Sequence, residues 1–474
     1  MTEVASLAAG FPPASEEAWT ELVRKTLKDR PPESLKGATV EALTIEPLYR
    51  PAADSRPLLG PRDPIRPWDV RTLVSHPDPA RANREILADL GGGAASVIVR
   101  IDPTGETGVA VGSAEGLARV LEGVELELAP VALEAGFLGP KAADWLHALA
   151  KSSPGARLLF HLDPLSGFAE AGASPGPVES HLIAAATVAA RLSQIYPKAS
   201  MFLASGRVVH EAGGGEAGEI AFAAAAGLAY AKALVRQGLP IDAAFAGLTL
   251  GLAADSDVFL SLSKLRAARL VWGRIAQASG PPAQARIEAR ASQRMLAAKD
   301  AWTNMLRLTA AGFAAAAGGA DAVVLGCFTD PLGLPTAFAR RQSRNAQLVL
   351  MEEAHVGRVA DPAAGSGYVE ALTDQLARAA WDRFQAIEAA GGIVAALASG
   401  LIARDVERAR LARDAAGKPR IVGVTAFPPE KDAPPEVERV EPRPVDAPSP
   451  RLPGPDGVCP PLTPIRLSAP FEAA

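Results

Sequence analysis

The chain has 474 residues, of which 48 % are hydrophobic and 21 % are charged, a balance typical of a globular protein with a large core. Its formal net charge is −5, its 48 basic and 53 acidic residues form no basic stripe, and its two cysteines are too few for a disulfide framework. These features, with no targeting pattern and no long apolar span, argue against nucleic acid or membrane as partner and favour a cytoplasmic protein.

The first predicted element is an amphipathic helix near the N-terminus. Ser15 is a favourable N-cap, and the acidic Glu16 and Glu17 suit the positive end of a helix. The apolar residues that share one face are Trp19, Leu22, Val23 and Leu27. Pro31 and Pro32 then end the pattern. Residues 1–60 are therefore predicted to form an arm outside the repeating part of the chain.

Between residues 97 and 360, short apolar runs alternate with Ala-rich helical stretches. The runs predicted to be strands are 97–101, 124–128, 158–162, 201–204, 243–252, 285–289, 322–325 and 357–360. This alternation favours a parallel sheet, and eight strands favour closure into a (β/α)₈ TIM barrel over residues 61–370. An open doubly wound sheet is the alternative. The apolar run 221–229 is too short to span a membrane and is predicted to be part of a buried helix.

The C-terminal part is predicted to contain two further segments. Residues 371–420 continue the helical periodicity, interrupted at Gly391 and Gly392, and form a helical linker segment. From about Val422 the chain is rich in proline and charge and has no periodicity, so residues 421–474 are predicted to form an extended tail. Such a tail is expected either to lie on a partner or to mark the loss of a C-terminal domain.

Seven stretches, in order along the chain, resemble one protein family. They are WTELVRKTLK with IEPLYR, IRPWDVR, the frame of Ser205-Gly206 and Glu211-Ala212-Gly213, KLRAARLVW, LGLPT, RNAQLVLMEE and DPAAGSGYVEALTDQLARAAW. From about residue 15 to 420 they resemble the methylmalonyl-CoA mutases, and the opening residues resemble the small (beta) subunits of that family. The resemblance implies a barrel that encloses acyl-CoA in catalytic members, and an adenosylcobalamin-dependent interconversion of methylmalonyl-CoA and succinyl-CoA.

The chain departs from the family's Ser-Gly-Tyr-His-Met-Gln-Glu-Ala-Gly motif where the resemblance places catalysis. Arg207 and Val208 replace the Tyr and the His near the thioester carbonyl, and a valine side chain donates no hydrogen bond. His210 stands where the family has Gln, and it could replace the lost His only through a two-residue shift along a strand, about 6.5 Å. We expect no such rescue and interpret Arg207 as a plug that pairs with Glu211.

Two other strand ends depart from the family in the same way. Asp63 replaces the tyrosine associated with the adenosyl group, and its charge is expected to be unfavourable in a dry cavity. The family's Arg-Thr-His-Ser-Gln run has Glu288 for His and Arg290 for Gln, and its His-Thr-Asn-Ser run becomes Val-Leu-Gly-Cys at 324–327. An anionic thioester would meet Glu288 unfavourably unless Arg290 neutralised it. The pattern indicates a retained fold with a lost site.

The motif that supplies the lower cobalt ligand in the family, Asp-x-His-x-x-Gly, is also absent. None of the six histidines has an aspartate two residues before it. They are His76, His147, His161, His181, His210 and His355. We therefore assign no catalytic, substrate-binding, cofactor-binding or metal-binding residue to this chain, and expect adenosylcobalamin on a partner.

Several other polar residues have a structural interpretation that we prefer to a functional one. Cys327 is predicted to be a buried thiol and not a nucleophile. His161 and Asp163 follow a strand, and are predicted to be part of the loop structure. The basic residues predicted to lie on a solvated or barrel-bottom face, and not on a partner, are Lys264, Arg266 and Arg269.

Three functions are compatible with the sequence. The first is a small, non-catalytic subunit that forms a heterodimer with a large catalytic mutase subunit. The alternative is a catalytic barrel that uses a separate cobalamin-binding chain and acts on another acyl-CoA. The third is an unrelated barrel enzyme. Arg207, Val208 and Glu288 favour the first hypothesis, because they stand where the resemblance requires catalytic or substrate-binding groups.

Overall fold

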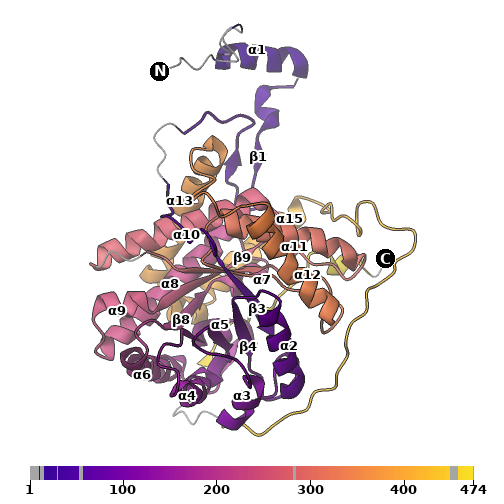
Figure 1. The fold of residues 1–474 in the computed structure, drawn as a ribbon. Coiled ribbons are helices and arrows are strands. Elements are labelled where there is room, and N and C mark those ends of the chain that lie inside the picture. The colour runs from indigo at the N-terminus through magenta and orange to yellow at the C-terminus, as the bar shows by residue number, and fades with distance from the viewer. Residues whose placement is uncertain are drawn as a thin grey trace, which may run out of the picture.

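Eight parallel strands close into a barrel in the computed structural model, which describes residues 10, 15–28, 30–52, 57–280, 284–448 and 457–472 (Figure 1). Around the ring the strands follow the order β10-β11-β3-β4-β5-β6-β8-β9. They are β3 (Asp69–Val74), β4 (Ser96–Arg100), β5 (Val131–Glu134), β6 (Leu158–Leu162), β8 (Ser200–Ser205), β9 (Leu248–Ala254), β10 (Ile287–Ala291) and β11 (Ala322–Val324). The predicted (β/α)₈ barrel is confirmed.

Two of the predicted strands are wrong. The run 124–128 forms a turn in which Leu128 is 78 % exposed, and the strand of that region is β5, directly after Pro130. The run 357–360 is a turn as well, whereas β3 at 69–74 was not predicted. The predicted strand 243–252 is also wrong in its first part, because Ile241–Ala246 is a helix and the strand begins at Leu248. The sequence did not predict β3 because this strand carries charged residues and forms no continuous apolar run.

The helices of the barrel lie around its outside (Figure 1). They are α2 (Pro79–Gly91), α3 (Ala114–Val120), α4 (Gly139–Ala150), α5 (Pro164–Ala171), α6 (Val178–Ile195), α7 (Arg207–Glu211), α8 (Glu216–Arg236), α9 (Ile241–Ala246), α10 (Val258–Ser279), α11 (Asn304–Ala317) and α12 (Ala337–Leu348). Helix α8 is long and apolar enough to cross a membrane, but 72 % of that stretch is buried within the protein. It is the buried helix that the run 221–229 predicted.

The N-terminal arm extends away from the barrel (Figure 1). It consists of α1 (Glu16–Leu27), η1 (Pro32–Leu35) and the short strands β1 (Gly37–Ala38) and β2 (Thr44–Ile45), which pair antiparallel. Helix α1 begins after Ser15, whose hydroxyl accepts the N–H of Ala18, and none of its residues is buried. The base of the arm is fixed by Glu41, which accepts the N–H of Ala217 at 2.9 Å and pairs with Arg383 at 3.0 Å.

After the barrel come a π-helical turn, η4 (Val349–Glu353), and three helices, α13 (Gly367–Ala389), α14 (Ile393–Ala398) and α15 (Leu401–Ala415). Helix α13 lies along α8 and α10. Among the described residues after α15, regular structure is limited to β12 (Gly457–Val458), which pairs antiparallel with β7 (Ala173–Ser174), and η5 (Ala469–Phe471). In the described residues this tail lies along its own barrel. That it also lies on a partner stays a prediction.

Gly206 permits the close approach of β8 and α8 that shapes this side of the barrel. A Cβ at Gly206 would lie 2.2 Å from the carbonyl oxygen of Glu219, a backbone atom that cannot move aside, whereas a Cβ at Gly273 of α10 meets nothing within 4 Å. We predict that Gly206→Ala lowers the free energy of unfolding by about 1–3 kcal/mol through overpacking. Gly273→Ala should raise it by about 0.5–1 kcal/mol. Urea unfolding measures both, and equal effects would contradict the packing argument.

Candidate functional site

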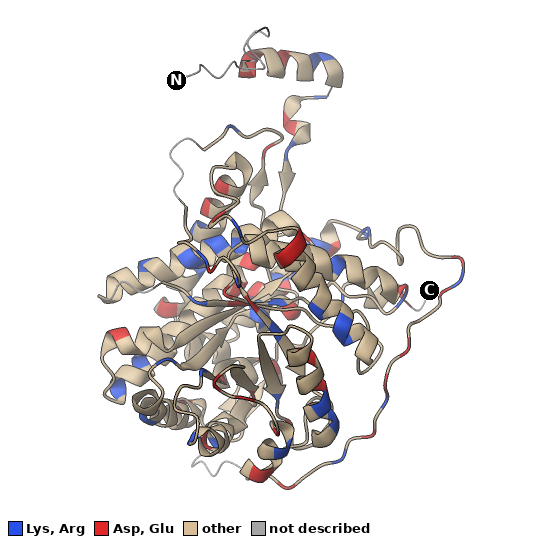
Figure 2. Cartoon of the chain, viewed as in Figure 1, with Lys and Arg blue, Asp and Glu red and all other residues tan. Residues whose placement is uncertain are grey.

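The interior of the barrel holds a network of charged side chains. Arg71 of β3 donates to Glu288 of β10 at 2.6 Å and to Asp69 at 2.6 Å, and its Nε donates to Ser96 of β4 at 2.8 Å. Oε2 of Glu288 also lies 3.9 Å from Nδ1 of His161 on β6. Charged residues are visible at the centre of the strands in Figure 2. The network thus places mutually paired charges inside the barrel.

One ion pair of this network crosses the barrel. Nη1 of Arg290 on β10 lies 2.7 Å from Oε2 of Glu134 on β5. These strands are four positions apart in a ring of eight, so they lie on opposite walls. Arg100 at the end of β4 also pairs with Glu134 at 2.6 Å. Glu288 and Arg290 were candidates from the sequence, whereas Arg71 and Glu134 were not, although charged residues within strands are a signal for such a network.

Burial and ion pairing oppose each other in this network. Burial alone would raise the pKa of Glu288, but attraction to His161, Arg71 and Arg290 outweighs it and lowers the pKa to about 2. Burial lowers the pKa of His161 to about 4, so this ring is neutral at pH 7. At that pH the guanidiniums of Arg71 and Arg290 supply the attraction to Glu288. Glu288 is therefore held as a carboxylate that is fully paired within the protein.

The two positions that replace the family's Tyr and His lie at the carboxyl ends of the strands, where chemistry occurs in such barrels. Arg207 and Val208 begin α7 directly after β8. The expected pair between Arg207 and Glu211 is wrong for the described residues, because the carboxylate of Glu211 accepts the N–H groups of Gln293 and Arg294 at 3.2 and 3.0 Å. Nε of Arg207 is buried and has no hydrogen-bond partner among the described residues.

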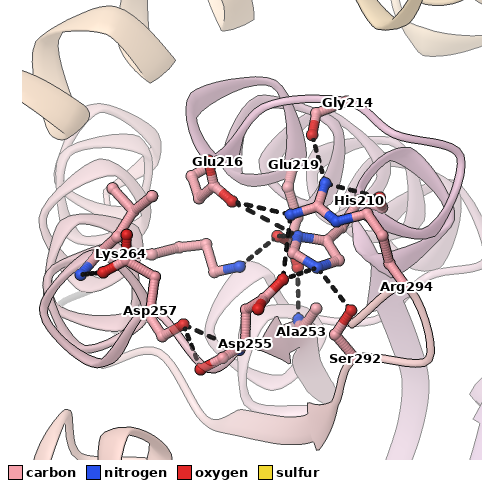
Figure 3. Close-up of polar contacts among 12 residues, drawn as sticks. His210, Gly214, Glu216, Glu219, Ala253, Asp255, Asp257, Lys264, Ser292 and Arg294 are labelled. Carbon is pink, nitrogen blue, oxygen red and sulfur yellow. Dashed lines mark hydrogen bonds and ion pairs between the residues drawn. The ribbon is translucent and has the colours of Figure 1, made fainter. Parts of the chain in front are cut away.

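His210 lies inside a second network, shown in Figure 3, and does not reach the position of the lost His. Its Nε2 lies 2.9 Å from Oγ of Ser292 and 3.4 Å from Oδ2 of Asp255, and its Nδ1 lies 3.3 Å from Oε2 of Glu219. Residues 207–211 are helical, so the shift along a strand that rescue would need has no counterpart in the structure. The imidazole is fully buried and its contacts are all with residues of this network.

The second network joins α8, β9, α10 and the loop after β10. Lys264 pairs with Glu219 at 2.6 Å, and Glu219 also accepts the N–H of Ala253. Arg294 donates to the carbonyl oxygens of His210 and Gly214 and pairs with Asp255 at 3.2 Å (Figure 3). Burial opposes the ionisation of Glu219, but Lys264 and His210 lower its pKa to about 2. The arrangement is a closed structural network within the chain.

The basic residues of the KLRAARLVW stretch correct a prediction. Lys264 and Arg266 are fully buried, so neither lies on a solvated face. Arg266 donates to Asp361 and, at 2.7 Å, to Glu370 at the start of α13. Arg269 alone lies at the bottom of the barrel, where it pairs with Asp321 at 2.9 Å. The stretch therefore holds helices together within the chain.

A hollow of about 790 Å³ opens at the amino ends of the strands. Asp63 lines it, and its carboxylate accepts the N–H groups of Ile65 and Arg66 at 2.8 and 3.0 Å in an exposed turn. This is the end of the barrel opposite to Arg207. The expectation that the charge of Asp63 enters a dry cavity is therefore wrong.

Three other candidate residues, Asp163, His161 and Cys327, have contacts that indicate a structural role. Asp163 caps α5 through the N–H of Ser166 and accepts the hydroxyl of Tyr230 at 2.5 Å, and burial raises its pKa to about 6. His161 belongs to the interior network and not to a loop. Cys327 is buried, and burial raises the pKa of its thiol well above the usual value, which disfavours the reactive thiolate.

Five of the six histidines have contacts within the chain. His161 and His210 face carboxylates in the two networks. Nδ1 of His76 accepts the N–H of Asp78 at 3.1 Å, Nδ1 of His147 lies 3.0 Å from the hydroxyl of Tyr196, and the His181 ring contacts Phe137. Within the described ranges, no three His, Cys, Asp or Glu side chains form a group that could hold a metal ion.

Comparison with known proteins identifies the family that this chain is similar to. The sequence model described as "Methylmalonyl-CoA mutase" matches residues 64–449. The "Methylmalonyl-CoA mutase small subunit" of Streptomyces virginiae is 40 % identical over 455 residues, which cover 89 % of this chain and 72 % of the relative. The protein of the same name from Propionibacterium freudenreichii subsp. shermanii is 34 % identical over 459 residues, covering 89 % and 70 %. The "Methylmalonyl-CoA mutase" of Cereibacter sphaeroides is 30 % identical over 463 residues, covering 89 % and 65 %.

The two networks predict that acid destabilises the fold. The pKa of His161 is lower in the folded protein than in the unfolded chain, so its contribution to stability is lost as the pH falls from about 6.5 to about 4. The contributions of Glu219 and Glu288 to stability are lost as the pH falls from about 4.5 to about 2, because their pKa values are lower in the folded protein. Each contribution is on the order of 3 kcal/mol.

Urea midpoints measured from pH 7 to pH 3 test this pH dependence. Glu288→Gln should flatten the curve below pH 4.5, because the glutamine does not titrate. Glu407→Gln on the exposed face of α15 is the matched control and should leave the slope unchanged. A wild-type curve that is flat below pH 6 would contradict the prediction.

Proposed function

The chain belongs to the methylmalonyl-CoA mutase family, and on that premise we propose that it is the small, non-catalytic subunit of a heteromeric adenosylcobalamin-dependent methylmalonyl-CoA mutase. The complex would interconvert methylmalonyl-CoA and succinyl-CoA on a large partner subunit. The relatives from Streptomyces and Propionibacterium carry the words "small subunit", which supports a larger partner. A cytoplasmic location agrees with two free, buried cysteines, since thiols persist in a reducing compartment.

The ion pair that crosses the barrel carries the proposal of a non-catalytic chain. In catalytic members the resemblance places acyl-CoA inside the barrel. Here such a ligand would have to separate Arg290 from Glu134 and Arg71 from Glu288. The side chains of Arg71 and Glu288 are only 6 % and 1 % exposed, so separation would leave charges buried without partners, which typically costs several kcal/mol. The interior therefore supports a barrel that serves as a scaffold.

We propose that adenosylcobalamin is held by the large subunit. When bound, this cofactor supplies the radical through homolysis of its cobalt–carbon bond. The present chain lacks the Asp-x-His-x-x-Gly motif, which supports this assignment. Its own residues would then contribute a stable surface for the partner and no step of the reaction.

The N-terminal arm supports a heteromeric arrangement. Helix α1 presents Trp19, Leu22 and Val23 on one side, Leu22 is 63 % exposed, and no residue of the helix is buried. A helix of 12 residues is marginally stable by itself in water, and most helices owe their stability to packing of an apolar face. The base of the arm is fixed by Glu41, so the helix is held away from its own barrel. A partner chain would supply the missing surface.

We predict that the isolated chain does not isomerise methylmalonyl-CoA, even with saturating adenosylcobalamin. Arg207 and Val208 provide no donor for the thioester carbonyl, and losing one such preorganised donor typically costs a factor of about 10² to 10³ in rate. The double variant Arg207→Tyr with Val208→His should remain inactive, because the ion pairs still fill the barrel. Turnover is measured by separating the acyl-CoA products, with an intact mutase as the positive control. Appreciable turnover by the wild-type chain would favour the alternative, a catalytic barrel with a separate cobalamin chain.

A second prediction concerns the arm. Leu22→Asp should weaken binding to the large subunit by about tenfold or more, because it places a charge on the apolar face of α1. Arg24→Gln on the opposite face changes the net charge equally and should have little effect. Titration by isothermal calorimetry measures both, and circular dichroism should show unchanged folding. Equal affinities of the wild type and Leu22→Asp would show that the arm is not part of the interface.

A further inference from the structure

The C-terminal tail makes a circuit of one end of the barrel. The stretch of it from residue 433 to residue 448 begins where Nε1 of Trp302, after β10, donates to the carbonyl of Ala433 at 2.8 Å. The N–H and carbonyl of Glu438 then pair with Leu334, after β11, and its carboxylate meets Arg81, after β3, at 2.5 Å. The part of the tail seen running down the right of Figure 1 follows this side of the barrel.

The circuit continues in strand order. The N–H of Val445 donates to the carbonyl of Pro103, after β4, at 2.8 Å. In the second described part, residues 457–472, β12 pairs with β7 and the N–H of Cys459 donates to Gly172, after β6, at 2.8 Å. Ile465 donates to Glu211, after β8, at 2.8 Å.

The end of the tail returns to the loop where the circuit began. The N–H of Leu467 donates to the carbonyl of Arg294 at 2.9 Å, and the hydroxyl of Ser468 donates to that of Leu296 at 2.9 Å. Both acceptors follow β10, as does Trp302. The tail thus visits the loops after β10, β11, β3, β4, β6 and β8 and returns to β10, the order of the strands in the ring. Every one of these contacts lies at the carboxyl end of the barrel.

The tail is held by many backbone hydrogen bonds and few buried side chains. In the first part the residues from Ala433 to Pro448 are mostly exposed, and in the second part Cys459, Leu462 and Ser468 are buried. Segments with little buried apolar surface open with a smaller free energy than the core of a domain. The barrel beneath is closed by its own strand pairs and does not include the tail. The tail can therefore leave the barrel while the barrel stays folded.

We propose that two stretches of the tail, residues 433–448 and 457–472, form a releasable strap that closes the carboxyl end of the barrel. While it is bound, the strap's N–H groups satisfy the carbonyls of the rim loops, including those of Pro103, Gly172 and Glu211. Opening of the strap, and not unfolding of the barrel, controls access to this rim.

The two cysteines allow a direct test in the full chain. Cys459 lies in the strap, where its Sγ is 3.5 Å from the carbonyl oxygen of Phe168, and Cys327 lies in the barrel. Iodoacetamide labelling at pH 8, followed peptide by peptide by mass spectrometry, reports strap opening at Cys459 and barrel unfolding at Cys327. We expect Cys459 of the wild type to react faster than Cys327.

Ser468→Ala removes an anchor of the strap and leaves the carbonyl of Leu296 without its donor. It should accelerate the labelling of Cys459 about tenfold and leave that of Cys327 unchanged. Thr463→Ala removes a hydroxyl from an exposed position of the same part of the strap, so it is the matched control and should change neither rate. The strap is refuted if the two cysteines react at one common rate in all three proteins, or if Ser468→Ala leaves Cys459 at the wild-type rate.

The first part of the strap is tested at Gly112, which lies against it. A Cβ at Gly112 would lie 1.9 Å from the carbonyl oxygen of Asp446, whereas one at Gly116 meets its neighbours at 3.5 Å or more. Gly112→Ala should speed hydrogen exchange of the Val445 amide about tenfold, and Gly116→Ala should not. Unchanged exchange at Val445 in Gly112→Ala would show that this part is not seated on the rim.

Discussion

A charge that is taken out of water inside a protein must meet an opposite charge there, and this constraint governs the barrel. Arg290 and Glu134 satisfy it from opposite walls, and Arg71 and Glu288 satisfy it beside them. Each pair is stable because it is complete, and each would be unstable if one partner turned to a ligand. The charged groups inside the barrel therefore bind one another and not a ligand.

The same constraint extends outwards from the barrel to the helices. Glu219 of α8 binds Lys264 of α10, and Arg266 of α10 binds Asp361 and Glu370 near the start of α13. These buried pairs fix the position of each helix relative to the next, since a charge displaced from its partner would have no water to replace it. The chain can therefore depart from its family at Arg207 and Val208 and still keep the KLRAARLVW stretch, whose role is internal.

The barrel was predictable from the sequence because strand–helix alternation depends on burial, which apolar runs report. The prediction failed at β3, where Arg71 points into the network, and at residues 124–128, where an apolar run lies in a turn. For the candidate site, the replaced residues could be read directly. Their partners could not, because the pairing of Arg290 with Glu134 joins residues 156 positions apart and depends on barrel closure. Asp63 was misplaced for the same reason, since the sequence does not state which end of the barrel a loop faces.

The path of the tail also has a consequence for the order in which the molecule is made. Loops after six different strands provide its anchors, so the tail has no complete binding surface until the ring has closed. A ribosome releases these residues after the strands, which precede them in the chain. Contacts that form after the rate-limiting step leave the rate of folding unchanged and slow the reverse reaction. The tail would therefore lengthen the lifetime of the finished barrel and contribute nothing to the speed with which it forms.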